Sequence, residues 1–279
     1  MIGIGLNIGN RVMGGGGGAP AFVGLLDTYP NAAAAYSVRL LKSDYTGSAI
    51  RVRRSSDNAE QNIGFTALGN LDTTALTTFC SGTNGFVTTW YDQSGNARNA
   101  TQTTAANQPQ IVSSGSVLNN INGLPTIQFD GINDNLASSS FTSQSQPYTI
   151  FMVQKWIGST YRYLLDLALD SAIGCVNGGV LQAAYFGGTI NSSLTANNTR
   201  NQLYYALANS TTSQISINNE TPVIGNAGTG AANKVTIGSY GGNLFFGNTF
   251  MSELVVYFSN NSSNRTGIST NINTYYGIY

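Results

Sequence analysis

The sequence predicts an all-β protein built as a sandwich or barrel, and three observations support this fold class. From about residue 32 onward, short segments rich in β-branched and aromatic residues follow one another. Clusters of Gly, Asn and Ser separate these segments, as turns do. Helical patterns are few, and 279 residues with 41% hydrophobic content suffice for one large core. This combination is typical of β-sandwiches.

The first 30 residues differ from the rest, and we expect an arm (1–30) followed by a sandwich domain (31–279). Five consecutive glycines make a flexible tether. The apolar residues before the tether alternate with Gly or Asn and form a tip that is expected to dock on another subunit. A disordered tail is the alternative interpretation. The residues of this assembly arm are Ile2, Ile4, Leu6, Ile8, Gly14, Gly15, Gly16, Gly17 and Gly18.

Strand patterns follow one another along the expected sandwich, with two short helices between them. The strand segments are 36–41, 49–54, 85–91, 125–129, 148–156, 161–167, 181–186, 202–208, 213–218, 234–240 and 249–257. Asp72 is placed to cap a helical turn through Ala75, Leu76 and Phe79. Near the C-terminus, Ser262 or Ser263 is placed to cap a helix with one apolar face, formed by Ile268, Ile272 and Tyr275 or Tyr276.

The charge composition excludes several classes of function. Charged residues are only 9% of the chain, against roughly 25% in ordinary globular proteins. Twelve basic and twelve acidic residues cancel, so neither nucleic acid nor an anionic membrane is an expected partner. The absence of histidine excludes a Ser-His-Asp or Cys-His site and argues against catalytic zinc. The N-terminus lacks a signal-peptide pattern, and no apolar run is long enough to span a membrane.

Cysteines and clustered cations each allow two interpretations. Cys80 and Cys175 are expected to be buried free thiols, with a single disulfide as the alternative. Five of the twelve cations lie close together in sequence with carboxylates near them, which indicates a salt-bridged solvent face; a polar groove or a subunit contact is the alternative. These cations are Arg39, Lys42, Arg51, Arg53 and Arg54.

Two Asx-rich turns are the candidate binding sites. Asp92 opens the turn Asp-Gln-Ser-Gly-Asn, which is explained either by an Asx-type turn or by a carboxylate facing a sugar or calcium site. The residues proposed for carbohydrate binding are Trp90, Tyr91, Asp92, Asn96 and Asn243. The second turn, 130–135, carries Asp130 and Asp134, whose oxygens make it a weak calcium candidate because the spacing is not that of an EF-hand.

The stretch FCSGTNGFVTTWYDQSGNARNATQ (79–102) resembles the catalytic domain of fungal arabinofuranosidases of glycoside hydrolase family 54. Residues 36–65, the segment LDTTALTTFC and the late segments 236–243 and 250–254 resemble the same domain. The opening segments also look like laminin-G-like modules of bacteriophage structural proteins. Both resemblances imply a concanavalin A-like or laminin-G-like, two-sheet antiparallel jelly-roll sandwich.

The departures from the hydrolase family concern its catalytic groups. Retaining hydrolysis needs two carboxyl groups. In the family the acid is an Asp after a Gly-Gly pair, where this chain has Asn243. The family nucleophile lies in an Asp-x-Glu segment, which this chain lacks, and the region between residues 184 and 202 is shorter. Glu253 matches a strand position outside the catalytic pair. The family also has a Cys five residues after the equivalent of Cys80, where this chain has Gly85.

These departures lead to the expectation of a bacteriophage virion structural protein without enzymatic activity, a spike, fibre or decoration subunit on the particle exterior. Its expected partners are other virion proteins bound through the arm, further copies of itself and a host surface glycan, with no cofactor apart from the calcium candidate. The alternatives are a glycan-active hydrolase that uses other carboxylates, such as Asp92 with Asp130 or Glu253, and a secreted lectin.

Overall fold

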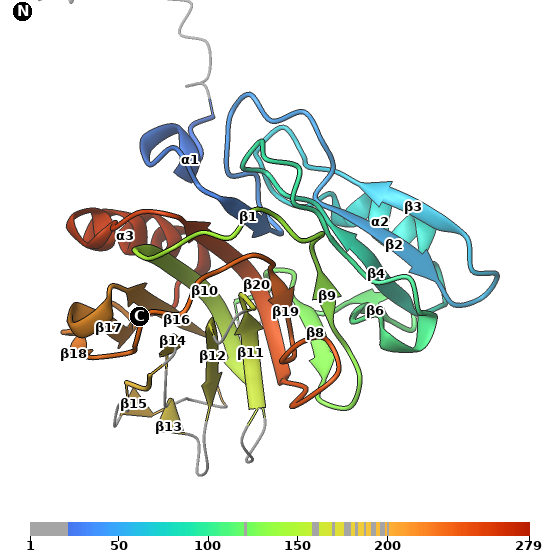
Figure 1. The fold of residues 1–279 in the computed structure, drawn as a ribbon. Coiled ribbons are helices and arrows are strands. Elements are labelled where there is room, and N and C mark those ends of the chain that lie inside the picture. Colours follow the sequence, from blue (N-terminus) through green and yellow to red (C-terminus); the bar gives the residue numbers. More distant parts are fainter. Residues whose placement is uncertain are drawn as a thin grey trace, which may run out of the picture.

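The computed structural model describes residues 22–119, 122–157, 162–168, 171–175, 180–181, 184–186, 188–190, 194–195, 199 and 201–279. The described part is an antiparallel β-sandwich with few helices (Figure 1). The predicted fold class is therefore confirmed. The residues predicted for the apolar tip and the glycine tether lie outside the described residues, so the arm stays a prediction.

Two runs of hydrogen-bonded strands build the sandwich. The first has the order β18-β17-β16-β10-β20-β1. Its strands are β1 (Ala34–Ser37), β10 (Tyr148–Trp156), β16 (Gln202–Ala208), β17 (Ser213–Ile217), β18 (Val223–Gly225) and β20 (Asn248–Tyr257). The long strands β10 and β20 lie at the centre of this run and pair along almost their whole length.

The second run has the order β3-β2-β4-β5-β9-β19-β11-β12-β14. Its strands are β2 (Ile50–Arg54), β3 (Glu60–Ile63), β4 (Gly85–Trp90), β5 (Ala100–Thr101), β9 (Leu136–Ala137), β11 (Arg162–Asp166), β12 (Ser171–Cys175), β14 (Ala184–Phe186) and β19 (Thr236–Ile237). Strand β8 (Ile127–Asp130) joins the two runs, because it pairs with β20 and with β6 (Gln110–Ser113), which in turn pairs with β4. Strand β7 (Ser116–Val117) pairs with β6, and β13 (Val180–Leu181) with β15 (Leu194–Thr195).

Burial along the strands follows their residue pattern. In β10 every residue except Lys155 is buried, which explains why it reads as an unbroken apolar run. In β2 the pattern alternates, with Ile50 and Val52 fully buried and Arg51 and Arg53 on the other face. The core therefore lies between the two runs and contains both tryptophans, Trp90 and Trp156.

Three α-helices cover the edges of the described sandwich (Figure 1). Helix α2 (Thr73–Phe79) is capped as predicted, since Asp72 Oδ1 accepts a hydrogen bond from the Ala75 amide at 2.9 Å. Helix α3 (Arg265–Tyr276) buries the predicted apolar face. Its predicted serine cap is wrong, because Ser262 and Ser263 lie in a preceding 3₁₀ turn (Ser262–Asn264) and no side chain caps the helix. Further 3₁₀ turns span Ala105–Asn107 and Ser210–Thr212.

The packed domain begins before residue 31, the predicted boundary, because helix α1 (Leu25–Thr28) is part of it. Leu25 is fully buried, and the Leu26 amide donates to the Leu41 carbonyl oxygen at 2.7 Å. Helix α1 also contacts α3, beside which it lies in Figure 1. Residues 25–28 therefore belong to the sandwich domain and not to an arm.

Candidate functional site

The turn after β4 is held together by Asp92, a buried residue. Its Oδ1 accepts from the amides of Ala35 (2.8 Å) and Ser94 (2.9 Å). Its Oδ2 accepts from the Arg98 amide (3.0 Å) and the Ser94 hydroxyl (2.8 Å). Both carboxylate oxygens therefore accept hydrogen bonds from within the protein. This geometry favours the Asx-turn interpretation over a carboxylate that faces a ligand.

The two aromatic residues before Asp92 differ in their accessibility. Trp90 has no exposed surface and packs against Tyr36 with ring centroids 6.0 Å apart, so its ring offers no stacking face to a sugar. Tyr91 is half-buried, and its hydroxyl donates to Asn62 Oδ1 at 2.9 Å. Carbohydrate binding by Tyr91 stays a prediction.

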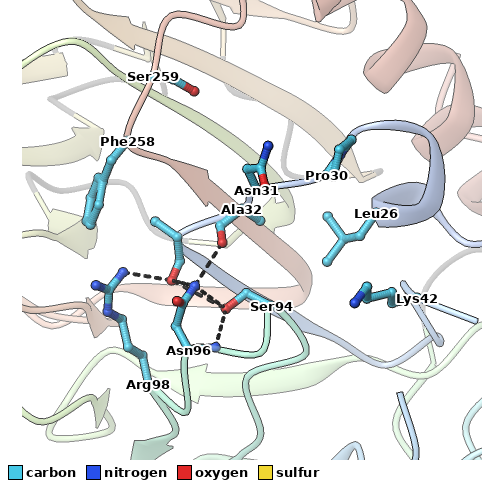
Figure 2. A pocket seen from close by; sticks show the side chains of 11 residues that line it. Leu26, Pro30, Asn31, Ala32, Lys42, Ser94, Asn96, Arg98, Phe258 and Ser259 are labelled. Carbon is cyan, nitrogen blue, oxygen red and sulfur yellow. Dashed lines mark hydrogen bonds between the residues drawn. The ribbon is translucent and has the colours of Figure 1, made fainter. Parts of the chain in front are cut away.

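A pocket of about 550 Å³ lies beside this turn (Figure 2). Asn96 lines it, and its side-chain amide donates to the carbonyl oxygens of Ala32 (3.0 Å) and Ala33 (3.1 Å). Among its described lining residues, Lys42 and Arg98 carry charge and none is a carboxylate. The described residues that line it are Leu26, Pro30, Asn31, Ala32, Ala33, Lys42, Ser94, Asn96, Arg98, Phe258 and Ser259. The described lining residues therefore supply none of the carboxyl groups that hydrolysis of a glycoside requires.

The turn between β8 and β9 carries two carboxylates, Asp130 and Asp134, that are linked through backbone amides. Asp130 Oδ1 accepts from the amides of Ile132 (2.8 Å), Asn133 (3.2 Å) and Asp134 (3.4 Å). Asp134 Oδ2 in turn accepts from the Asp130 amide at 2.9 Å. Each carboxylate is left with one oxygen, Oδ2 of Asp130 and Oδ1 of Asp134, that has no hydrogen-bond partner among the described residues.

Both carboxylates line a second pocket, of about 310 Å³, between β4, β6 and β8. Its other lining residues are Phe86, Ala105, Ala106, Gln108, Gln110 and Gln128. Burial, and to a lesser extent the charge of Asp130, raises the pKa of Asp134 to about 7. Asp134 therefore keeps its proton up to near-neutral pH, as a general acid must.

Arg53 borders this second pocket without neutralising it. Its Nε donates to Gln108 Oε1 at 2.7 Å, and its guanidinium lies 5.0 Å from the centroid of the Phe86 ring. Within the described part of the chain, Arg53 makes no ion pair with Asp130 or Asp134. This absence of a paired cation is consistent with a carboxyl group that stays protonated.

The turn that carries Asn243 is a direct neighbour of the Asp134 turn. The side-chain amide of Asn135 donates to the Gly242 carbonyl oxygen at 3.1 Å, and Asp166 Oδ2 accepts from the Gly241 amide at 2.8 Å. Asn243 itself is exposed. The position that resembles the family acid therefore lies one hydrogen bond away from the segment that contains Asp134.

Glu253 is unavailable for chemistry because Arg39 holds it in the core. Arg39 donates from Nε to Oε2 (2.7 Å) and from Nη2 to Oε1 (3.0 Å), and Glu253 has no exposed surface. Oε2 also accepts from the hydroxyls of Ser37 (2.8 Å) and Tyr276 (3.2 Å). The alternative that used Glu253 as a catalytic carboxylate therefore finds no support in this geometry.

The basic cluster is mainly a salt-bridged solvent face, with two exceptions. Arg39 is buried and paired with Glu253, and Arg53 donates to the side-chain oxygens of Gln108 and Asn58 instead of a carboxylate. Ion pairs join Lys42 to Asp44 (3.0 Å), Arg51 to Glu60 (2.5 Å) and Arg54 to Asp57 (2.6 Å).

Cys80 is a buried free thiol, so no disulfide joins it to Cys175. A Cβ atom at Gly85 would lie 2.7 Å from Cys80 Sγ and 3.1 Å from Val112 and Val52 atoms. The residue that replaces the second family cysteine thus lies directly beside Cys80.

Within the described residues, no group of three or more Asp, Glu, Cys or His side chains is arranged to hold a metal ion. The calcium candidate at Asp130 and Asp134 stays a prediction. None of the described helices combines the length and hydropathy needed to cross a membrane.

Comparisons with known proteins show which proteins this chain resembles in sequence and in fold. The family model described as "Alpha-L-arabinofuranosidase B, catalytic" matches residues 26–133. A probable alpha-L-arabinofuranosidase B of Aspergillus terreus is 42% identical over 74 residues, and an alpha-L-arabinofuranosidase of Hypocrea jecorina 40% identical over 73 residues. Each alignment covers 26% of this chain and 15% of the relative.

Solved structures extend the similarity of fold to most of the chain. A mutant of a family 54 α-L-arabinofuranosidase soaked with 4-nitrophenyl α-L-arabinofuranoside matches with a TM-score of 0.63 and 19% identity. An arabinofuranosidase complexed with arabinofuranosyl-α-1,2-xylobiose matches with a TM-score of 0.59 and 18% identity. Both matches cover 86% of this chain and 62% of the other, so the chain spans less than two thirds of the proteins it matches.

These matches support an arabinofuranosidase-like domain, and they overturn the expectation of a non-enzymatic virion protein. The family model and the named relatives are arabinofuranosidases, and those relatives come from fungi. The predicted virion partners and the location on a phage particle are wrong for the same reason. The laminin-G-like resemblance to phage proteins has no support in these matches. That expectation rested on Asn243 in place of the family acid and on the missing Asp-x-Glu segment.

Sequence reasoning did not identify Asp134 as an acid, although it marked the turn as acidic. The signal was present in the Asp-x-x-x-Asp spacing, but the burial of Asp134 depends on residues of other segments, among them Phe86 of β4 and Gln110 of β6. Arg98 and Phe258, which are in contact at the larger pocket, carried no sequence signal because they are 160 positions apart.

Proposed function

We propose that this chain is a glycoside hydrolase domain of the arabinofuranosidase type, with Asp134 as its general acid. The observation that carries the proposal is a carboxyl group with a pKa of about 7 that lines a pocket next to a second carboxylate, Asp130. Perturbed carboxyl groups in clefts are frequent at catalytic sites. The arabinofuranosidase relatives supply the substrate class to test first.

Hydrolysis of a glycosidic bond needs a proton for the leaving oxygen and stabilisation of the positive charge that develops on the sugar. Protonated Asp134 would donate through Oδ1, the oxygen that no described residue bonds. Asp130 would stabilise the charge on the sugar through its Oδ2, because its Oδ1 is occupied by three backbone amides. Gln110 and Gln128 line the same pocket and provide hydrogen-bonding groups for sugar hydroxyls.

The proximity of the Asn243 turn explains how acid catalysis could persist without the family acid. Asn243 cannot donate a carboxylic proton, but Asn135 joins its turn to the segment of Asp134. In this proposal the acid has moved from one turn to its neighbour, while the substrate still lies between the two. Asp92 and Glu253 are unsuited to the role because their oxygens are bonded within the protein.

The test is hydrolysis of 4-nitrophenyl α-L-arabinofuranoside by the whole chain and by Asp134→Asn. Loss of a general acid should lower kcat by about 10²–10⁴-fold, with a smaller change in KM. Glu220→Gln, at an exposed carboxylate, is the matched control and should retain wild-type turnover. Parallel assays with EDTA and with added calcium test the calcium candidate at the same turn.

A third variant, Asn243→Asp, separates this proposal from simple loss of function. If the wild-type chain is inactive and Asn243→Asp alone produces turnover, Asp134 is not the acid and the proposal fails. Equal turnover of the wild-type and Asp134→Asn proteins would contradict it as directly.

A further inference from the structure

We propose that the larger pocket, beside the Asp92 turn, is a separate binding site for an acidic sugar that carries one carboxylate, such as a uronic acid. It lies between α1, the start of β1, the turn 94–98 and the residues after β20 (Figure 2). The hydrolytic site proposed above lies in a different pocket, so the two inferences stand independently.

Arg98 is the group that would recognise the carboxylate. Its Nη1 donates to the Ala33 carbonyl oxygen at 2.8 Å, and its guanidinium lies 4.2 Å from the Phe141 centroid and 5.1 Å from that of Phe258. These contacts fix the plane of the guanidinium. The donors Nε and Nη2 have no hydrogen-bond partner among the described residues, and a planar fork of this kind matches a carboxylate.

No carboxylate of the protein neutralises Arg98 in the described part of the chain. The Asp92 carboxylate accepts a hydrogen bond from the backbone amide of Arg98, not from its guanidinium. It also accepts hydrogen bonds from the amides of Ala35 and Ser94. Arg98 forms no ion pair with any described residue. An unpaired cation in a pocket without lining carboxylates favours an anionic ligand.

Lys42 adds a second positive charge on the opposite side of the pocket in Figure 2. Its partner Asp44 lies 3.0 Å away, but both side chains are exposed, and such a pair holds its members weakly. Lys42 is therefore available to a ligand at small cost. A second cation on the opposite wall raises the positive potential of the pocket, which favours an anionic ligand over a neutral one.

The remaining lining suits the ring of a sugar rather than a bare anion. Phe258, Pro30 and Leu26 provide apolar surface, and Asn31, Ser94 and Ser259 provide polar groups for hydroxyls. The volume of about 550 Å³ lies within the range of small-molecule sites and far exceeds what an inorganic anion fills. Together these features favour a carboxylated sugar over a neutral sugar or sulfate.

The experiment is an NMR titration of the full chain with D-glucuronate, and with D-glucose, acetate and sulfate as separate probes. Glucuronate should saturate and shift the amides of residues 31–33 and 94–98. Arg98→Gln should weaken this binding by about tenfold or more, and Lys42→Gln by several-fold. Lys234→Gln removes one charge outside the pocket and should leave the affinity unchanged.

Three outcomes would overturn the proposal: no saturable shift at these amides up to roughly 50 mM glucuronate, equal binding of glucose or sulfate, or wild-type affinity in both pocket variants. Lys42→Gln remains informative if Arg98→Gln does not fold, because the Lys42 side chain is exposed. Asp134→Asn should bind glucuronate as wild type does, so failure of the hydrolase proposal would not affect this one.

Discussion

Glu253 and Asp134 are both buried acidic residues, but the protein surrounds them in opposite ways. Glu253 accepts two hydrogen bonds from Arg39 and one each from Ser37 and Tyr276. Asp134 accepts one backbone amide and has a second carboxylate, Asp130, as its neighbour. The comparison teaches that burial alone does not indicate a site. The carboxyl group that lacks a compensating cation is the one that can carry a proton at neutral pH.

The paired carboxylate should give the largest effect on stability. Glu253→Gln leaves the buried guanidinium of Arg39 without a counter-charge, and the free energy of unfolding should fall by about 3–5 kcal/mol. Urea denaturation at pH 7 measures this change. Glu220→Gln, at the surface, should stay within about 0.5 kcal/mol of wild type. A loss equally small in Glu253→Gln would mean that the ion pair is dispensable and would remove the contrast with Asp134.

Replacement of the unpaired carboxyl, in Asp134→Asn, should change the free energy of unfolding by less. The change should be an increase instead of a decrease, and it should depend on pH. The raised pKa of Asp134, about 7, means that the folded chain holds a proton that the unfolded chain releases above about pH 4. This contribution to stability is complete below pH 4 and is lost as the pH rises to 7. Screening by solvent reduces it to about 1–2 kcal/mol.

Asp134→Asn removes this titration, so wild type and variant should be similarly stable at pH 4, while the variant should be more stable at pH 8. Denaturation in urea at the two pH values gives the comparison. A variant that is less stable than wild type at pH 8 would show that the ionised Asp134 stabilises the turn, contrary to this account.

Much of the fold could be predicted from local sequence, because the apolar residues within a segment determine whether it forms a buried strand. The strands predicted at 148–156 and 202–208 coincide with β10 and β16, whose apolar residues are buried on both faces. The strand expected over 234–240 is only Thr236–Ile237, since Gly238 has a φ of 85°. Its amide donates to the Leu164 carbonyl oxygen in β11, and its carbonyl oxygen accepts from the Gly247 amide. Helix α1 was missed because four residues carry no helical periodicity.

The site was less predictable because its properties depend on residues far apart in sequence. Arg39 and Glu253 are 214 positions apart, and only folding shows that they form a pair. The acidic turn 130–135 was recognised, but its proton affinity depends on burial by strands from elsewhere in the chain. Asp92 was open to two interpretations until its four hydrogen bonds were known.

The most direct test of the central claim is a carboxyl ¹³C NMR titration of Asp134 in the folded chain. The account predicts a midpoint near pH 7 in wild type, because burial and the charge of Asp130 both oppose ionisation. In Asp130→Asn the midpoint should fall but stay above the ordinary range, since burial is the larger cause. A wild-type midpoint near pH 4, the value of an exposed aspartate, would contradict the account.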